Sequence, residues 1–246
     1  MNALDRIYSD DLVARMRGGE VLLGSFHDFI DPTLIEVVGA CGFDFVVLEL
    51  EHGLRSMNDI QSLIRAAEVA GTSPLVRLGD VTENLVARLL DGGATGILVP
   101  NVRTAKDVET VVRWSYYPPL GTRGTAFRRG PLMVRGEAEV RRREERNNSV
   151  AVIAIIENEE AVDNIESILE VDGLVGVMPG PGDYALSLGN VTWDDPRVGA
   201  AMNKIREAVG KTDKLLIEFG VNPADTARFV AGGAHGGMIG HDAFLI

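Results

Sequence analysis

Short runs of apolar, often β-branched residues recur along the chain, and each is followed by a longer stretch with apolar positions at helical spacing. Such runs are typical of strands buried on both faces, and the stretches between them are typical of amphipathic helices. We expect eight strands, at residues 21–26, 44–49, 74–78, 96–100, 151–157, 174–178, 214–219 and 236–239. We expect seven helices between them, at residues 32–40, 56–70, 81–91, 104–116, 159–171, 196–209 and 223–231.

Eight strand–helix units in a chain of 246 residues predict a parallel (β/α)8 barrel, the TIM-barrel fold of the α/β class, as one domain over residues 1–246. The alternative is a doubly wound open sheet, which usually has fewer strands and a glycine-rich nucleotide loop after the first strand. Two irregularities interrupt the repeat. Residues 118–148 form a long insertion before the fifth strand, and the chain stops at Ile246 without an evident eighth helix.

The insertion contains a predicted helix at residues 137–146 that is almost entirely charged. Long insertions of this kind cover a site or lie at an interface. The arginines of this helix, Arg141, Arg142, Arg143 and Arg146, alternate with Glu144 and Glu145, so we interpret it as a solvated helix with internal ion pairs.

The chain carries 36 acidic and 24 basic side chains, a formal net charge of −12. This excess argues against nucleic-acid binding, because a surface that follows phosphates needs basic side chains. Residues 1–20 lack the apolar core of a signal peptide, and no apolar run approaches the ~18 residues of a membrane span. The single cysteine, Cys41, excludes an internal disulfide and suits a reducing compartment. We therefore expect a cytoplasmic protein that binds neither nucleic acid nor membrane.

Polar residues gather where the predicted strands end. In a barrel of this type the carboxyl ends of the strands form one mouth, and functional side chains lie there. Seven of the eight strands end in such residues, namely His27-Asp28, Glu49-Leu50-Glu51-His52-Gly53, Arg77, Glu157-Asn158, Gly180-Pro181-Gly182-Asp183, Glu218 and His241-Asp242.

Two carboxylates at this mouth, Glu157 and Asp183, are candidate ligands for one hard divalent cation, because magnesium typically takes one or two protein carboxylates. The alternative interpretation is that each acid simply favours the start of a helix, where negative charge is stabilising. The glycines around Asp183 favour a ligand site there, since they let backbone N–H groups approach an anion.

His52 and Arg77 are candidates for proton transfer and for anion binding. A histidine at the rim of the mouth can exchange protons near neutral pH, although a lone histidine is more often a structural one. Arg77 lies inside an apolar strand and must have an anionic partner, either a substrate carboxylate or an internal acid such as Glu49.

The lysines exclude one mechanism. An aldolase that forms an imine needs a desolvated lysine in the mouth of the barrel. Lys106 and Lys204 fall on predicted outer helices, Lys211 falls in a loop, and Lys214 precedes the seventh strand at its amino end. Schiff-base chemistry is therefore not expected.

Five segments occur in an order that resembles a known family: residues 43–52 (FDFVVLELEH), Val76-Arg77, residues 89–94 (LLDGGA), residues 117–124 (YPPLGTRG) and residues 180–183 (GPGD). Together they resemble the HpcH/HpaI aldolase family, over about residues 24–245. These are metal-dependent pyruvate aldolases with a barrel of the phosphoenolpyruvate/pyruvate-binding type. They act on 4-hydroxy-2-oxo acids, such as 4-hydroxy-2-oxoheptanedioate and 2-keto-3-deoxy acids.

The resemblance implies a role for each matching residue. Glu157 and Asp183 match the ligands of a divalent metal, usually Mg²⁺, Mn²⁺ or Co²⁺, and Arg77 matches the arginine that contacts the keto oxygen. His52 matches the histidine of proton transfer, and Asp91 matches an aspartate that pairs with it from a neighbouring subunit. The N–H groups of Gly182 and Asp183 match those that hold the pyruvate carboxylate. The family implies a homo-oligomer, typically a hexamer built as a trimer of dimers that exchange their last helix.

Three positions depart from the family pattern. Ile155 stands where a glutamine usually precedes the metal-binding glutamate, Glu49 replaces an aspartate, and Leu50 replaces a glycine. These changes lie in the mouth and bear on the specificity of the aldol reaction.

The sequence therefore predicts a divalent-metal aldolase that cleaves or forms 4-hydroxy-2-oxo acids through a pyruvate enolate. The alternatives are a decarboxylase or other lyase acting on a related 2-oxo acid or thioester acid, and a binding protein for 2-oxo acids that does not turn over. We expect the loops after strands one, seven and eight to select the aldehyde half of the substrate, through residues such as His27, Glu218, Phe219 and His241. His27 or His241 could also be a ligand for a softer metal.

Overall fold

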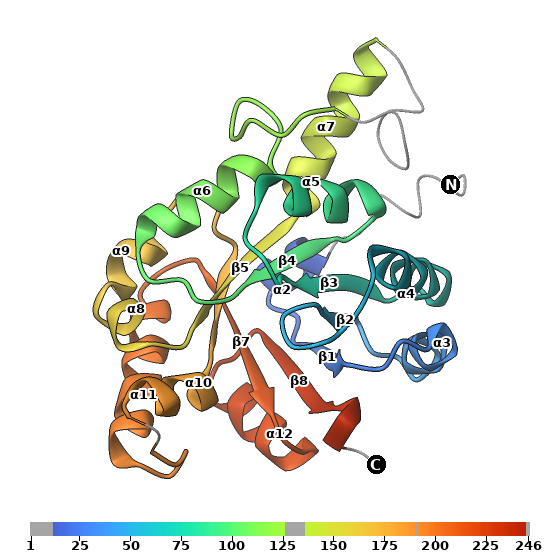
Figure 1. The fold of residues 1–246 in the computed structure, drawn as a ribbon. Coiled ribbons are helices and arrows are strands. Elements are labelled where there is room, and N and C mark those ends of the chain that lie inside the picture. The colour runs from blue at the N-terminus through green and yellow to red at the C-terminus, as the bar shows by residue number, and fades with distance from the viewer. Residues whose placement is uncertain (1–11, 126–135, 190, 245–246) are drawn as a thin grey trace.

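The computed structural model describes residues 12–125, 136–189 and 191–244. Eight parallel strands pair in chain order, and β1 also pairs with β8, so the sheet closes into a barrel (Figure 1). The predicted TIM barrel is thus confirmed, and the open-sheet alternative is wrong. The strands are β1 (Leu22–His27), β2 (Phe45–Glu49), β3 (Ser73–Arg77), β4 (Gly96–Val99), β5 (Ala151–Ile156), β6 (Gly176–Pro179), β7 (Leu215–Gly220) and β8 (Gly236–His241).

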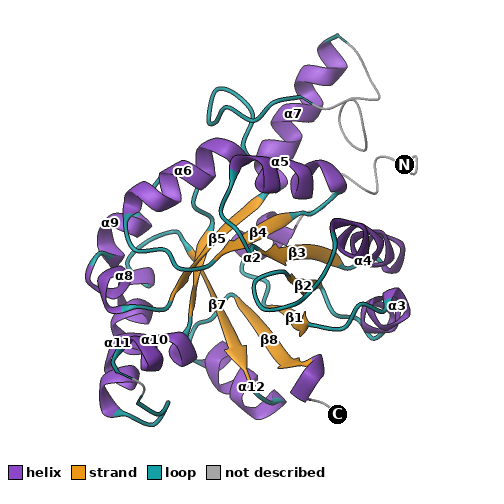
Figure 2. Cartoon of the chain, viewed as in Figure 1, coloured by secondary structure: helices purple, strands orange, loops and turns teal. Residues whose placement is uncertain are grey.

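Helices surround the barrel, as Figure 2 shows. They are α2 (Leu12–Arg17), α3 (Pro32–Ala40), α4 (Met57–Ala70), α5 (Glu83–Gly92), α6 (Ala105–Ser115), α7 (Glu137–Ser149), α8 (Glu159–Asp163), α9 (Ile165–Leu169), α10 (Pro181–Ser187), α11 (Pro196–Val209) and α12 (Pro223–Ala231). The helix predicted at residues 159–171 is two short helices, because Asn164, with φ −92° and ψ 10°, leaves the helical conformation between them. Helices α2 and α10 were not predicted.

Alternation along the strands divides the core into two clusters. Phe45, Val47 and Ile153 point into the barrel, whereas Val46 and Leu48 point outward against the helices. Residues Leu12, Val13 and Met16 of α2 belong to the inner cluster, so this helix closes the barrel at the amino ends of the strands. The opposite end, where the carboxyl ends of the strands meet, is left for the site.

Strand β8 contains an irregularity that matters for the site. Gly24 and Phe26 of β1 pair with Met238 and His241 of β8, so two steps along β1 match three along β8. Gly240 has φ 70°, a backbone conformation that glycine adopts without strain. The strand ends in the 3₁₀ helix η2 (Asp242–Phe244), and no helix of the outer layer follows β8 within the described chain.

The helix α7 of the insertion projects beyond the ring of helices (Figure 1). Its predicted internal ion pairs are present in part, since Arg141 pairs with Glu137 at 3.9 Å and Arg143 with Glu139 at 3.4 Å. Arg146 corrects the prediction of a fully solvated helix: it is buried and donates to the carbonyl of Ala94, because the last turn of α7 packs against the start of the barrel. The described helices include none that is long and apolar enough to cross a membrane.

Candidate active site

Glu49 and Arg77 form the centre of the mouth. Glu49 Oε2 accepts from Arg77 Nε at 2.5 Å and from a second guanidinium nitrogen, and the acid is 1% exposed. Glu49 Oε1 accepts the backbone N–H groups of Glu51 and His52, the latter at 3.0 Å. Arg77 therefore has internal acids as partners, which was one of the two predicted possibilities. The side chain of Glu49, one methylene longer than the aspartate of the family pattern, contacts both Arg77 and the backbone of the loop that follows β2.

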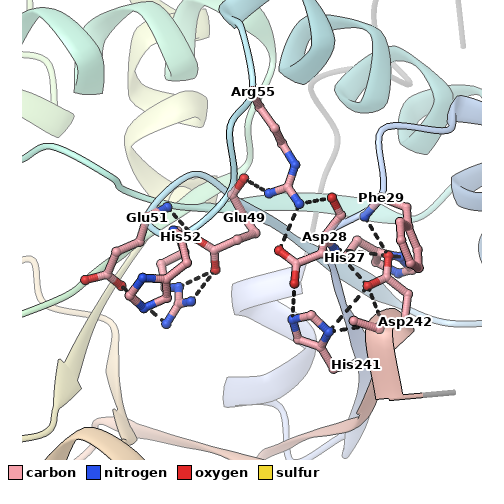
Figure 3. Close-up of polar contacts among 11 residues, drawn as sticks. His27, Asp28, Phe29, Glu49, Glu51, His52, Arg55, His241 and Asp242 are labelled. Atoms are coloured by element: carbon pink, nitrogen blue, oxygen red, sulfur yellow. Dashed lines mark hydrogen bonds and ion pairs between the residues drawn. The ribbon is translucent and has the colours of Figure 1, made fainter. Parts of the chain in front are cut away.

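Glu51 and His52 follow on the same loop. Arg77 Nη1 lies 3.3 Å from Glu51 Oε2, and the His52 imidazole Nε2 lies 3.9 Å from the same oxygen. The His52 side chain is 64% exposed, so it is not packed as a structural histidine would be. Its ring stands at the rim of the mouth beside an acid, as Figure 3 shows.

Glu157 lies one residue beyond β5 and is held by the loop after β4. Its Oε1 accepts the N–H of Asn101 at 2.5 Å, and the Asn101 amide also donates to Glu51 Oε1 at 3.2 Å. Asn101 has φ 55°, a conformation that asparagine tolerates better than most residues. Gly180 lets Glu157 approach closely, because a Cβ on residue 180 would lie 2.7 Å from Glu157 Cβ and 3.2 Å from its Oε2.

Asp183 is in the first turn of α10. The segment Gly180-Pro181-Gly182-Asp183 is the start of this helix, with Gly180 at the cap and Pro181 at its first position. The side chain of Asp183 is exposed, and the N–H groups of Gly182 and Asp183 lie in the first turn, where a helix provides no acceptor. This end of α10 faces the carboxyl ends of the strands.

The acids of the mouth perturb one another. Burial raises the pKa of Glu157 to about 7 despite the hydrogen bond from Asn101, and the charge on Asp183 adds to the rise. Burial also raises the pKa of Glu51, while the charge of Arg77 opposes that shift. Glu157, Asp183 and Glu51 are thus close enough to interact, and a cation among them would relieve their repulsion.

A second polar cluster lies on the other side of the mouth (Figure 3). Asp28 Oδ2 is 3.0 Å from His241 Nε2, and Asp28 Oδ1 accepts from Arg55 at 2.9 Å. Asp242 Oδ2 accepts the N–H groups of Asp28 at 3.0 Å and Phe29 at 2.9 Å. Burial raises the pKa of Asp242, but the His27 imidazole and these N–H groups outweigh it and lower the pKa to about 2.

Two residues expected to select the aldehyde are not at the mouth. Glu218 is buried and pairs with Arg206 of α11 at 2.6 Å, because Ile217 and Phe219 are the inward-facing positions of β7. His27 is buried against Ser25, its Nε2 2.7 Å from Ser25 Oγ, so its ring is not presented to a substrate. Phe219 and His241 do lie on the barrel interior, beside Phe26.

Asp91 lies at the opposite end of the barrel from the mouth. It is in the last turn of α5, which runs antiparallel to the strands, and its Oδ1 accepts from the buried Arg123 at 2.6 Å. Among the described residues of this chain, Asp91 has no hydrogen bond or ion pair with His52.

The lysines lie where the sequence predicted. Lys106 is on α6, Lys204 is on α11, and Lys211 follows α11. Lys214 donates to the carbonyls of Val171 at 3.2 Å and Leu174 at 3.1 Å, at the amino end of the barrel. An imine with a lysine of this chain's mouth is therefore excluded.

Sequence reasoning missed two residues that build the site. Asn101 follows β4, so the rule that selected the other strand ends could have found it. Arg55 lies in an irregular loop, where no sequence pattern distinguishes it from a surface arginine. Its side chain is 2% exposed and donates to the carbonyls of Glu49 and Asp28, which ties the two halves of the mouth together (Figure 3).

The sequence model of the HpcH/HpaI aldolase/citrate lyase family matches residues 23–246. The chain belongs to this family. A 2-keto-3-deoxy-L-rhamnonate aldolase from Klebsiella pneumoniae is 29% identical over 248 residues, which cover 100% of this chain and 91% of the relative. The crystal structure of the citrate synthase SbnG has a TM-score of 0.86 and 33% identity, with 94% of this chain and 91% of that one covered.

A more distant solved structure shares the barrel fold. A citrate lyase beta subunit from M. tuberculosis, complexed with oxaloacetate and magnesium, has a TM-score of 0.60 at 16% identity, covering 94% of this chain and 95% of that one. Family membership places the chain among enzymes of the aldolase and lyase class, whose aldolases act on small organic acids.

Proposed function

We propose that this protein is a divalent-metal aldolase that cleaves or forms 4-hydroxy-2-oxo acids through a pyruvate enolate. One observation carries the proposal: the Arg77 guanidinium, fixed by Glu49 and Glu51, shares a mouth with the carboxylates of Glu157 and Asp183. The guanidinium can bind an oxyanion, and the two carboxylates can bind a cation. The aldolase relatives support the same class of reaction.

The residues present fit a hard cation. Glu157 and Asp183 offer carboxylate oxygens, and a side chain at Gly180 would crowd Glu157, since its Cβ would lie 3.2 Å from Oε2. Glu51 Oε2 is buried and accepts no hydrogen bond from the described residues. We assign Glu157 and Asp183 as the ligands of Mg²⁺, Mn²⁺ or Co²⁺. When bound, such an ion supplies Lewis acidity that polarises the 2-oxo group.

The chain's own groups orient the substrate. Arg77 would donate to the C2 oxygen and stabilise the negative charge that develops there, because its position is set in advance by Glu49. The N–H groups of Gly182 and Asp183, at the start of α10, would bind the C1 carboxylate. These contacts leave C3 and C4 directed toward the open part of the mouth.

Cleavage needs one proton to leave the substrate. His52, directly or through a water, would take the proton of the C4 hydroxyl as the C3–C4 bond breaks. The bonding electrons pass into the C2–C3 bond of the pyruvate enolate, and C4 becomes the carbonyl carbon of the released aldehyde. Addition reverses these steps, with His52 returning the proton to the new alkoxide.

A homo-oligomer would complete the site. We propose that a second copy brings its Asp91 to His52, as the family resemblance implies, in a hexamer or trimer of dimers. The position of Asp91 at the far end of its own barrel supports a contribution between chains rather than within one.

Retro-aldol turnover of a 4-hydroxy-2-oxo acid by metal-stripped protein tests the proposal. Activity should return with Mg²⁺, Mn²⁺ or Co²⁺ and be lost in Glu157→Gln. Glu159→Gln removes an equal charge from an exposed position two residues away and serves as the matched control. Full activity of Glu157→Gln after chelation would overturn the metal assignment.

A second candidate is a lyase or decarboxylase acting on oxaloacetate or a thioester acid. It is favoured by the similarity to the citrate synthase SbnG and by Ile155, which places an apolar side chain beside Glu157. NMR of the products from oxaloacetate and from 4-hydroxy-2-oxo acids separates the two. Tight pyruvate or oxalate binding without turnover of any of them would indicate a binding protein instead.

A further inference from the structure

We propose that Asp28 is a specificity-determining residue whose carboxylate accepts hydrogen bonds from hydroxyl groups on the aldehyde half of the substrate. The inference rests on the proposed aldolase function and concerns the part of the substrate that the metal, Arg77 and His52 do not hold. It follows from the way three other residues fix a carboxylate that remains open to the mouth.

Asp28 is directed into the mouth by the alternation of β1. Side chains alternate along a strand, and those of Leu22 and Phe26 point into the barrel. Asp28, two residues after Phe26 and one residue beyond the end of β1, continues this inward-facing series. Its side chain is 34% exposed, whereas its partners Arg55 and Asp242 are 2% and 6% exposed. The His241 side chain is 15% exposed, so Asp28 is the most accessible of these four side chains.

The partners of Asp28 hold both its backbone and its carboxylate. Asp242 Oδ1 accepts the Asp28 N–H at 2.9 Å, and Arg55 donates to the Asp28 carbonyl and to Oδ1. His241 Nε2 lies 3.0 Å from the other carboxylate oxygen. A carboxylate fixed on both oxygens keeps lone pairs for further donors and loses little freedom when it binds them.

His241 positions Asp28 and has no donor to spare for a substrate. The bulge at Gly240 turns its ring toward the barrel interior, where it stacks on Phe26 with the ring centres 5.2 Å apart. His241 Nδ1 lies 3.2 Å from the Ala243 nitrogen and 3.4 Å from Asp242 Oδ1, and Nε2 lies 3.0 Å from Asp28 Oδ2, so both ring nitrogens already have partners within the protein. His241 is therefore a positioning residue.

Phe26 connects this cluster to the arginine that would hold the 2-oxo group. The Arg77 guanidinium lies over the Phe26 ring at 5.0 Å, and the same ring carries His241. Arg55 also donates to the carbonyls of both Glu49, the partner of Arg77, and Asp28, so the two groups are neighbours in the mouth and a substrate anchored at Arg77 would extend toward Asp28. The part that extends there is the aldehyde half.

The chemistry of the cluster selects neutral hydroxylated aldehydes. Hydroxyl groups donate to a carboxylate, whereas a terminal carboxylate on the substrate would be repelled by Asp28 and Asp242. The nearby guanidinium of Arg55 is already bound to Asp28 and to two backbone carbonyls. A metal site is not the better interpretation of Asp28, His241 and Asp242, because Asp242 already accepts three backbone N–H groups.

Aldol addition of pyruvate to three aldehydes tests the inference: glyceraldehyde, propionaldehyde and succinic semialdehyde. The wild-type protein should prefer glyceraldehyde over succinic semialdehyde. Asp28→Ala and Asp28→Asn should each lower kcat/KM for glyceraldehyde at least tenfold and leave that for propionaldehyde within about twofold, as expected for a lost hydrogen bond to a charged group. His241→Phe should reduce the same glyceraldehyde-to-propionaldehyde ratio. Asp194→Asn, an equal charge change at an exposed loop position, should leave it unchanged.

An equal loss on glyceraldehyde and propionaldehyde, no loss on either, or a wild-type preference for succinic semialdehyde would overturn the assignment. Metal-dependent deuterium exchange at the pyruvate methyl group needs no aldehyde and is measured in parallel. Wild-type protein that lacks this exchange contradicts the proposed function itself, whereas exchange without the aldehyde selectivity contradicts only the role of Asp28.

Discussion

Glu49 and Arg77 are register partners on the neighbouring strands β2 and β3, and Arg77 Nε donates to Glu49 Oε2 at 2.5 Å. The acid is almost completely buried, so the guanidinium is its counter-ion in a place that water hardly reaches. The pair sets the position of the arginine before any ligand arrives. Arg77, which we propose binds the substrate, therefore also stabilises the barrel through its pair with Glu49.

Removing Glu49 should destabilise the protein strongly. Glu49→Ala leaves the partly buried Arg77 with Glu51 alone, and breaking a buried pair in this way costs about 3–5 kcal/mol. Glu20→Ala breaks an exposed pair with Arg15 and should cost less than about 1 kcal/mol. Urea denaturation measures both free energies of unfolding, and similar small losses would contradict a structural role for the Glu49–Arg77 pair.

His52 should affect turnover without affecting the metal. Its ring is exposed and lies beside Glu51. Among the described residues, His52 makes no hydrogen bond to the proposed metal ligand Glu157. His52→Ala is expected to lower kcat of cleavage by about 10²–10⁴-fold, the usual contribution of a general acid–base group. Because His52 is not a proposed metal ligand, the Mn²⁺ affinity of His52→Ala, measured by titration calorimetry, should stay within about threefold of the wild-type value. A loss of Mn²⁺ binding that matched the loss of kcat would make His52 a ligand instead.

Glu218 should matter for stability and not for the substrate. Its carboxylate is buried against Arg206, outside the barrel wall. Glu218→Ala removes the acceptor of the Arg206 guanidinium and should lower the free energy of unfolding by about 1–3 kcal/mol. The KM values for aldehydes should not change. A raised KM for the aldehyde with unchanged stability would instead indicate that Glu218 contacts the substrate.

The pKa of Asp242 predicts a loss of stability in acid. Its folded pKa of about 2 lies below the ordinary value of 3.8, so ionised Asp242 stabilises the folded state above pH 4. That contribution is lost as the pH falls from about 4 toward 2. The difference in unfolding free energy between the wild-type protein and Asp242→Asn should therefore be larger at pH 5 than at pH 2.5. A difference that is the same at both pH values would contradict the lowered pKa.

The strands of this fold were predictable for a physical reason. Parallel strands in a barrel are buried on both faces, so they appear as continuous apolar runs, and helices between them repeat with a different period. Helix α10 was missed because it has only seven residues and starts within a segment of glycines and proline that resembles a turn.

The direction of side chains was harder to predict than their position along the chain. Glu218 was placed at the mouth because it ends a strand, yet the alternation with Ile217 and Phe219 directs it outward. The reverse holds for His241, which a strict alternation from Met238 would direct outward and which the bulge at Gly240 returns to the interior. Arg55 depends on contacts between loops that no local pattern encodes.

Exchange of the pyruvate methyl protons in D₂O, followed by proton NMR, tests the central claim most directly, because it reports enolate formation without an aldehyde. We expect rapid exchange with wild-type protein and Mg²⁺, Mn²⁺ or Co²⁺. We expect no exchange above the background rate after chelation or in Glu157→Gln, and unchanged exchange in Glu159→Gln. Exchange that proceeds at the wild-type rate in metal-free protein would contradict a metal-stabilised pyruvate enolate.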